Sequence, residues 1–334
     1  MTAPGGAGDT RQSPKASVVI PVKNGGPLLK EVLQAVLQQA TPWPFEVLVI
    51  DSGSGDGSVA TVQALGVQVV EIAPEAFGHG RTRNLGAELT TGEFIVFITQ
   101  DALPSDEHWL NHLVAAAEQE APVEVAGAFG RHLAYAGSHP AIARDLANFF
   151  RGFGETANVV HLEDPARYGA EVGYRQFLHF FSSNNACLRR RIWEQIPLPE
   201  VDFAEDQQWA KAIIEAGYGK AYAPDAVVYH SHNLGVWESY RRAFDESRAF
   251  KRHFGYDLMP RKWDVLRQGV RLTLRDWRWI AADCPSWPTR LYWWFWTPSL
   301  TLAKLLGMYA GNHPHVLPTW LTRRSSRDGA LQKS

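Results

Sequence analysis

The sequence predicts an α/β fold in which helices flank a mostly parallel sheet. Between Ala16 and Arg131, strand-like and helix-like segments alternate, and the strand-like segments are apolar on both faces. This alternation is typical of a parallel sheet covered by helices. Polar residues gather just after the strands end, which is where such sheets bind their ligands.

The elements follow in chain order from their apolar patterns. β-Branched apolar runs predict strands, and apolar residues three and four positions apart predict helices. The expected strands are residues 16–22, 45–50, 67–72, 93–98 and 123–129, and the expected helices are residues 27–40, 57–65, 81–89, 106–120 and 205–216. Residues 131–181 break the rhythm and are rich in aromatic residues, Gly and His, so we expect an irregular insertion near a site. Regularity returns at residues 182–193 and ends in residues 226–233.

Composition restricts the class of protein. The 334 residues are 45% hydrophobic, enough for one large domain or a domain with an appendage, and the net charge of -2 gives no reason to expect nucleic acid as a partner. The two cysteines, Cys187 and Cys284, exclude a disulfide framework and fit a reducing compartment. Residues 1–15 are rich in Gly, Pro and Ser and lack the apolar segment of a signal peptide, so we expect a disordered arm.

Residues 240–334 have a different composition from the rest. They contain 17 Lys and Arg against 7 Asp and Glu, and eight of the 13 Trp. This composition is typical of a membrane surface, although a helical layer packed on the main domain would also explain it. Pro298 and Lys304 interrupt the apolar run Leu291–Gly311. Because a spanning helix needs about 20 apolar residues, we expect an interfacial or packed helix.

Two of the predicted strand ends carry features that suit a nucleotide. Asp51 follows the second strand in "DSGSGDGS" and could accept from a base or a ribose hydroxyl; alternatively, its Asp and Ser residues cap the turn and the next helix. The glycine spacing is not that of a dinucleotide-binding loop. Arg81 and Arg83 lie in the first turn of the helix after the third strand, where cations are unfavourable. They indicate an anion such as phosphate, or two solvated side chains.

Other polar residues suggest metal binding and proton transfer. Asp101 follows the fourth strand on the same edge, where a divalent Mg²⁺ or Mn²⁺ could bridge it to a pyrophosphate. His230 or His232 could supply a further ligand, although a lone H-x-H pair is often structural. Glu205 and Asp206 begin an amphipathic helix, where they either complement the helix dipole or present a general base.

Seven segments in this order resemble the glycosyltransferase family 2 enzymes, which have a GT-A fold. The segments are "SVVIPVKNGG", "VLVIDSGSGDGS", "GRTRNLGAE", "FITQDALP", "FFSSNNACLRR", "FAEDQQWA" and "VVYHSHN", and they cover Ser17 to Asn233. "FGHGRTRNLG" together with "TQDALP" is most similar to the bacterial rhamnosyltransferase branch. The resemblance implies a GT-A catalytic domain at residues 16–239, with residues 131–181 lining the acceptor side. A helical extension at residues 240–334 follows.

The resemblance also implies roles for individual residues. Asp206 would be the catalytic base with Glu205 beside it, and Asp101 the metal ligand with His230 and His232 nearby. Only one carboxylate is present where the family usually has paired aspartates, because Gln100 and Ala102 flank Asp101. The residues expected near the donor are Pro21, Asp51, Ser52, Arg81, Arg83, Asn84 and Gln100.

The implied reaction is an in-line displacement with inversion at the anomeric carbon. dTDP-rhamnose is the first expectation for the donor, with UDP- or GDP-hexoses behind it, and the acceptor is a glycan or lipid-linked glycan of a cell-surface polysaccharide. Such an enzyme is expected in the cytoplasm, peripheral on the inner face of the cell membrane and in contact with anionic lipid.

Two other classes of protein share some of these sequence features. A sugar nucleotidyltransferase should carry a Gly-rich basic loop after its first strand, and "PVKNGGP" matches that loop poorly. A non-catalytic membrane-surface protein would explain the basic extension. It would not explain Asp51, Asp101 and Asp206 together.

Overall fold

The computed structural model describes residues 13–326, apart from residues 202, 285 and 317. Most of the arm expected at residues 1–15 lies outside the described residues. Within them, a nine-stranded sheet has the order β3-β2-β1-β4-β8-β6-β9-β5, and β7 pairs with β9. The strands are β1 (Ala16–Val22), β2 (Phe45–Asp51), β3 (Gln68–Glu71), β4 (Phe94–Ile98), β5 (Leu103–Pro104), β6 (Val125–Leu133), β7 (Asn158–Val160), β8 (Asn185–Arg189) and β9 (Gly219–Tyr229).

The sheet is mixed, and the expectation of a mostly parallel sheet holds only for its first half. Strands β1 to β4 are parallel, and β6 is parallel to β9. β8 runs antiparallel between β4 and β6, and β5 and β7 run antiparallel to β9. After β7, the chain returns through α6 (Pro165–Ala170) and α7 (Val172–His179) to the edge at which β6 ends, and β8 therefore runs in the reverse direction.

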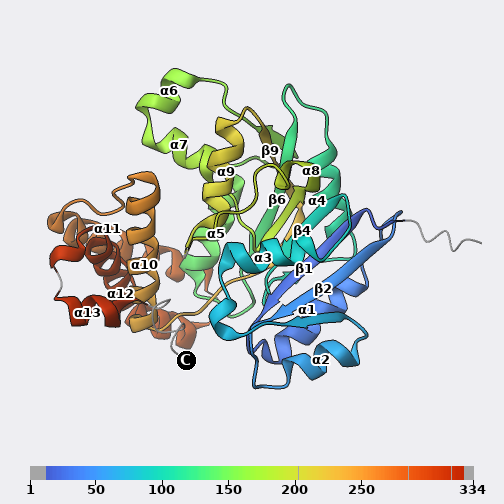
Figure 1. Cartoon of the computed structure of the whole chain (residues 1–334). Helices are drawn as coiled ribbons and strands as arrows, with labels where there is room; N and C mark the ends of the chain where they lie inside the picture. Colours follow the sequence, from blue (N-terminus) through green and yellow to red (C-terminus); the bar gives the residue numbers. More distant parts are fainter. Residues whose placement is uncertain (1–12, 202, 285, 317, 327–334) are drawn as a thin grey trace, which may run out of the picture.

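Helices cover both faces of the sheet (Figure 1). α1 (Gly26–Leu37), α2 (Ser58–Ala64) and α4 (Trp109–Glu118) pack on one face, and α3 (His79–Glu88), α8 (Arg190–Trp193) and α9 (Glu205–Glu215) on the other. Neighbouring β1 residues show why both faces need cover. Val18 and Ile20 belong to the first hydrophobic cluster and Val19 to the second, and all three are fully buried.

The segment after Arg131 is not irregular, contrary to the sequence prediction. β6 continues to Leu133, and three short helices follow: α5 (Pro140–Arg151), α6 (Pro165–Ala170) and α7 (Val172–His179). Aromatic rings pack around Lys220, a fully buried β9 residue whose ammonium donates to the carbonyl of Phe177 at 2.9 Å and to that of Phe180. α6 and α7, with 6 and 8 residues, are too short for their apolar spacing to stand out in the sequence.

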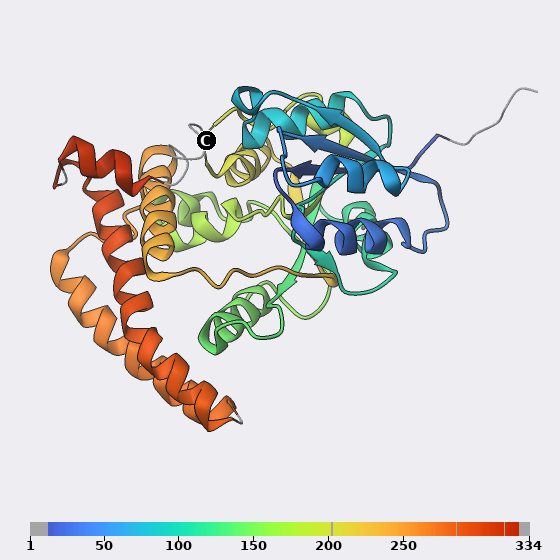
Figure 2. The same ribbon diagram turned by 90° about the horizontal axis from the view of Figure 1, so that it is seen from below.

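The C-terminal region is helical, as expected, and gathers on one side of the molecule (Figure 1). Its helices are α10 (Val236–Phe254), α11 (Lys262–Asp283), α12 (Trp287–Asn312) and α13 (Thr319–Ser325). α12 packs closely on α10 through Gly307 and Gly311, where an added Cβ would lie 2.2 and 2.3 Å from α10 carbonyl oxygens. α11 and α12 run side by side, outside α10 (Figure 2). Among the described residues, no helix is long and apolar enough to cross a membrane.

Candidate active site

The predicted site residues follow strand ends that meet at one edge of the sheet. Val22 at the end of β1 pairs with Asp51 at the end of β2. Ile98 at the end of β4 pairs with Asn185 at the start of β8. Tyr229 ends β9 beside the end of β6. The residues that follow these positions therefore share the edge at which an α/β sheet binds its ligands.

Asp51 closes the turn after β2. Its buried carboxylate accepts from the N–H of Gly53 at 2.9 Å, the N–H of Ser54 at 2.8 Å and the Ser54 hydroxyl at 2.6 Å. Gly53 has φ 87°, a conformation that glycine adopts readily. These contacts agree with the alternative in which Asp51 caps the turn. A nucleotide at Asp51 would use the remaining acceptor capacity of the same carboxylate.

Ser52 and Gln100 connect neighbouring loops at this edge. The Ser52 hydroxyl donates to the carbonyl of Val22 at 3.0 Å. The Gln100 side chain accepts from the N–H of Lys23 at 2.8 Å and donates to its carbonyl at 3.1 Å. Pro21, in β1, is partly exposed beside them. These contacts fix the ends of β1, β2 and β4 relative to one another and so shape the expected nucleotide side.

Arg81 and Arg83 have different environments. Arg83 is buried, and its guanidinium donates to Glu205 Oε1 at 2.8 Å and to the carbonyl of His79 at 3.1 Å. Arg81 is exposed and pairs with Glu200 at 3.1 Å. The alternative of two solvated arginines therefore fits Arg81 but not Arg83. The anion beside Arg83 in the structure is a carboxylate of the protein itself.

The Asn84 amide makes its hydrogen bonds inside the protein. Its oxygen accepts from the indole of Trp193 at 2.9 Å and from the N–H of Leu198 at 3.2 Å, while its nitrogen donates to the Leu198 carbonyl at 2.8 Å. One turn earlier in α3, a Cβ on Gly80 would lie 2.1 Å from the Pro199 carbonyl oxygen. α3 is thus fixed against the segment that leads into α9.

Asp206 lies in the first turn of α9 and keeps part of its surface exposed. Its Oδ2 accepts from the N–H of Ser183 at 3.0 Å, and its Oδ1 accepts from the N–H of Gln207 at 2.8 Å. Burial and the neighbouring Glu205 charge raise the pKa of Asp206 to about 7, and the two backbone hydrogen bonds and the Arg83 charge only partly oppose this shift. Asp206 can therefore take up and release a proton near neutral pH.

Glu205, the neighbour of Asp206, is shifted in the opposite direction. Burial alone would raise the pKa of Glu205, but the positive charges of Arg83 and His79 hold it below its ordinary value. The Ser183 hydroxyl also donates to Glu205, at 3.1 Å. Two adjacent carboxyl groups thus differ in state at neutral pH. Glu205 is ionised, and Asp206 titrates.

The backbone before this pair is strained. Ala204 precedes α9 with φ 61° and ψ 35°, a left-handed backbone conformation that residues other than glycine rarely adopt. Such a residue costs about 1–3 kcal/mol and is found mainly at functional sites. The strain here accompanies the turn that directs Glu205 inward and leaves Asp206 partly exposed.

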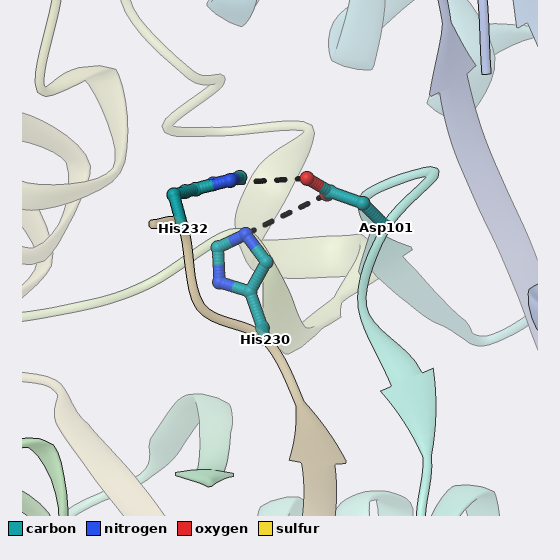
Figure 3. A group of neighbouring side chains, drawn as sticks. All are labelled: Asp101, His230 and His232. Atoms are coloured by element: carbon teal, nitrogen blue, oxygen red, sulfur yellow. Dashed lines mark ion pairs between the residues drawn. The ribbon is translucent and has the colours of Figure 1, made fainter. Parts of the chain in front are cut away.

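Asp101, His230 and His232 form a cluster beyond the ends of β4 and β9 (Figure 3). The His230 and His232 Nε2 atoms lie 3.5 and 3.7 Å from the two Asp101 carboxylate oxygens. All three ligand atoms lie within 4.8 Å of one another, close enough to hold one divalent cation. Burial lowers the pKa of His230 to about 4 despite Asp101, so its imidazole is neutral and free to ligate at pH 7.

A loop after β6 supports this cluster. The Tyr135 hydroxyl donates to the Asp101 carbonyl at 3.0 Å, and the Tyr135 N–H donates to the hydroxyl of Ser231 at 2.9 Å. His139, at the start of α5, shares a hydrogen bond of 3.0 Å with Thr297 of α12. The loop therefore connects the Asp101 cluster to the C-terminal helices.

Sequence reasoning assigned no role to Ser183 or Tyr135. Ser183 belongs to the quoted segment "FFSSNNACLRR", and its place in a polar run before a buried strand was the available signal. Tyr135 lies inside the segment expected to be irregular, and nothing in its local sequence indicates a contact with Asp101. Both contacts depend on the reversed direction of β8 and on the length of β6.

Comparison with known proteins agrees with this architecture. Residues 17–191 match the model of glycosyl transferase family 2. Over 314 residues, the chain is 32% identical to the O-antigen chain rhamnosyltransferase RfbN of Salmonella typhimurium, with 91% of each chain covered. Over the same length it is 27% identical to the O-antigen chain rhamnosyltransferase WbaN of Salmonella anatum, again with 91% of each covered.

Solved structures share the fold. The mannosyltransferase PcManGT of Pyrobaculum calidifontis, in complex with GDP-Man and Mn²⁺, superposes with a TM-score of 0.54 at 20% identity, covering 91% of this chain and 89% of its own. Residues 1–349 of S. aureus TarS, in complex with UDP-GlcNAc, give a TM-score of 0.51 at 17% identity, covering 90% and 92%. Together with the family match, these similarities establish that the chain belongs to glycosyl transferase family 2, has a GT-A fold and is a glycosyltransferase.

Proposed function

We propose that this glycosyltransferase inverts the anomeric carbon and transfers L-rhamnose from dTDP-rhamnose to a hydroxyl of a glycan or lipid-linked glycan. The rhamnosyltransferases similar over 91% of the chain support the sugar and a role in cell-surface polysaccharide synthesis. The observation that carries the proposal is the pair of functional groups at one sheet edge. Asp206 is a partly exposed carboxyl with a pKa of about 7, and Asp101 lies with two imidazoles close by the strand ends.

Asp206 acts as the general base. Its ionised carboxylate accepts the proton of the acceptor hydroxyl while that oxygen attacks the anomeric carbon and the bond from carbon to the diphosphate oxygen breaks. A single displacement needs no carboxylate nucleophile and inverts the carbon. The hydrogen bonds from Ser183 and Gln207 hold the carboxylate in place. The negative charge of the adjacent Glu205 keeps its proton affinity high.

The Asp101 cluster fits a divalent cation, and of Mg²⁺ and Mn²⁺ we propose Mn²⁺. One carboxylate and two imidazole nitrogens suit a transition metal, whereas Mg²⁺ prefers oxygen ligands throughout. When bound, such an ion would offset the negative charge that develops on the departing nucleoside diphosphate. The nucleotide would lie against four residues that we continue to propose for it: Pro21, Asp51, Ser52 and Gln100.

Three further residues are proposed to lie beside the donor: Arg81, Arg83 and Asn84. Arg83 would act through its ion pair with Glu205.

We further propose that the enzyme works in the cytoplasm, at the inner face of the cell membrane. dTDP-sugars and lipid-linked glycans would meet there. The excess of basic residues and Trp in residues 240–334 supports this location.

A donor screen tests the proposed sugar. Purified enzyme with Mn²⁺ is expected to be stabilised most by dTDP-rhamnose, because a ligand at 100 times its Kd adds about 2.7 kcal/mol to the free energy of unfolding. Thermal unfolding would be compared among dTDP-rhamnose, dTDP-glucose, UDP-GlcNAc and GDP-mannose, followed by turnover of each. Preferred binding and turnover of a UDP- or GDP-sugar would contradict the rhamnose proposal.

The Asp206→Asn substitution should reduce kcat by roughly 10²–10⁴-fold, the usual contribution of a general base, and leave donor binding intact. Asp225→Asn, at an exposed position in β9, is the matched control and should be close to wild type. Normal turnover by Asp206→Asn would exclude the assignment.

The same substitution has a pH-dependent effect on stability. The folded-state pKa of Asp206 is about 7, above its ordinary value of 3.8, so wild type loses stability as the pH rises through 7. The Tm of Asp206→Asn relative to wild type should therefore be higher at pH 8 than at pH 5.

Asp101→Ala should weaken Mn²⁺ binding, and with it the Mn²⁺-dependent affinity for dTDP, while the affinity for thymidine hardly changes. Calorimetric titrations of Mn²⁺, dTDP and thymidine measure these affinities without turnover. Glu107→Ala, at an exposed carboxylate nearby in sequence, should bind all three as wild type does. Unchanged Mn²⁺ affinity in Asp101→Ala, or full activity of metal-free wild type in excess EDTA, would refute the metal site.

A further inference from the structure

Two long helices carry apolar side chains that none of the described residues covers. On α11, Trp263, Val270 and Leu274 are 70%, 55% and 44% exposed, and their spacing of seven and four residues places them on one side of the helix. On α12, Leu291, Phe295 and Leu302 are 52%, 74% and 46% exposed and follow the spacing of four and seven. We call these six side chains the hairpin face.

Both halves of the hairpin face lie on the side of the helices opposite α5. On α11, Asp276 pairs with Arg144 of α5 at 2.7 Å, and Leu274 lies two residues earlier. On α12, Thr297 bonds His139 at the start of α5, and Phe295 lies two residues earlier. Two residues of an α-helix span 200°, so Leu274 and Phe295 both point away from α5. The helices lie side by side at the outer edge of the molecule (Figure 2).

Arginines border the apolar side chains. Arg267 and Arg271 follow Trp263 by four and eight residues, and Arg278 follows Leu274 by four, so they lie along the same side of α11. All three are exposed. Exposed apolar side chains flanked by arginine are typical of a helix that lies in the interface of an anionic membrane.

The charge of the two helices decides which partner fits. Residues 261–304 contain eight Lys and Arg and three Asp. Of these aspartates, Asp276 is held by Arg144 and Arg275, and Asp264 lies 3.9 Å from Arg267. A second copy of the chain would bring the same positive surface against itself, whereas anionic lipid headgroups complement it. Trp263 supplies a side chain that favours the headgroup region.

We propose that the hairpin face lies flat on an anionic lipid bilayer, with its apolar side chains in the interface and Arg267, Arg271 and Arg278 at the headgroups. This proposal rests on the proposed function for its purpose, which is to bring the sheet edge to a lipid-linked acceptor. The link from α12 through His139 and Tyr135 to Asp101 would hold that edge in a fixed orientation relative to the bilayer.

Vesicle flotation with the full-length protein tests the proposal. Wild type should bind phosphatidylcholine vesicles that contain phosphatidylglycerol, should not bind phosphatidylcholine alone, and should dissociate as salt is added. Leu274→Gln with Phe295→Gln should reduce the partition coefficient by roughly tenfold or more, because both side chains would lose burial in the interface. Leu37→Gln with Leu89→Gln, at positions 41% and 46% exposed elsewhere on the surface, is the matched control and should bind as wild type does.

The arginines are tested separately. Replacing Arg267, Arg271 and Arg278 by Gln should weaken partitioning by roughly fivefold for each charge removed, and replacing the same three by Lys should restore it. Donor turnover in solution with a soluble acceptor should be the same in all these variants. Turnover without vesicle binding would overturn the membrane inference and the proposed location, and would leave the proposed sugar-transfer reaction intact. Vesicle binding without turnover would contradict the proposed reaction and leave the membrane inference intact.

Sedimentation velocity excludes the other occupant. In the absence of lipid, wild type is expected to show no dimer that depends on the hairpin face. A dimer of that kind would be one that the double substitution Leu274→Gln with Phe295→Gln dissociates. Such a dimer, or binding to phosphatidylglycerol vesicles that neither set of substitutions weakens, would overturn the proposal.

Discussion

The buried ion pair between Arg83 and Glu205 is the constraint on which the rest of the site depends. Each side chain is almost fully buried, so removing either partner leaves an uncompensated buried charge that destabilises the fold by about 3–5 kcal/mol. The pair joins α3 to the first turn of α9 and fixes the negative charge next to Asp206. That charge, together with burial, brings the pKa of Asp206 to about 7. The ion pair therefore holds, next to the proposed base, the charge that adds to the effect of burial on its pKa.

The fold supplies the other half of this arrangement. Because β8 runs against its neighbours, its N-terminal end and Ser183 lie at the same edge as the C-terminal ends of β4 and β6. Ser183 donates from its N–H to the Asp206 carboxylate and from its hydroxyl to the Glu205 carboxylate. At the same edge, the loop after β6 binds the Asp101 carbonyl on one side and α12 on the other. The proposed base, the metal cluster and the C-terminal helices are thus connected through short hydrogen-bonded segments.

The sequence allowed β1 to β4, β6, the main helices and the edge of the sheet to be predicted, because strands buried on both faces and amphipathic helices leave clear periodic patterns. It also placed Asp101, His230 and Asp206 at strand or helix ends. It did not distinguish a solvated Arg81 from a buried Arg83, since both occupy the same turn of the same helix. The roles of Ser183 and Tyr135 depend on strand direction and strand length, which local patterns do not encode. α6 and α7 escaped detection because a helix of 6 or 8 residues shows little periodicity.

The central claim is that Glu205 raises the proton affinity of Asp206, and the pH dependence of kcat/KM for Glu205→Gln tests it most directly. Removing the Glu205 charge, with Arg83 left in place, should lower the pKa of Asp206 and move the acidic limb of the profile to lower pH than in wild type. The comparison requires variant protein with a cooperative unfolding transition. An acidic limb that stays in place, or that moves to higher pH, would contradict the account.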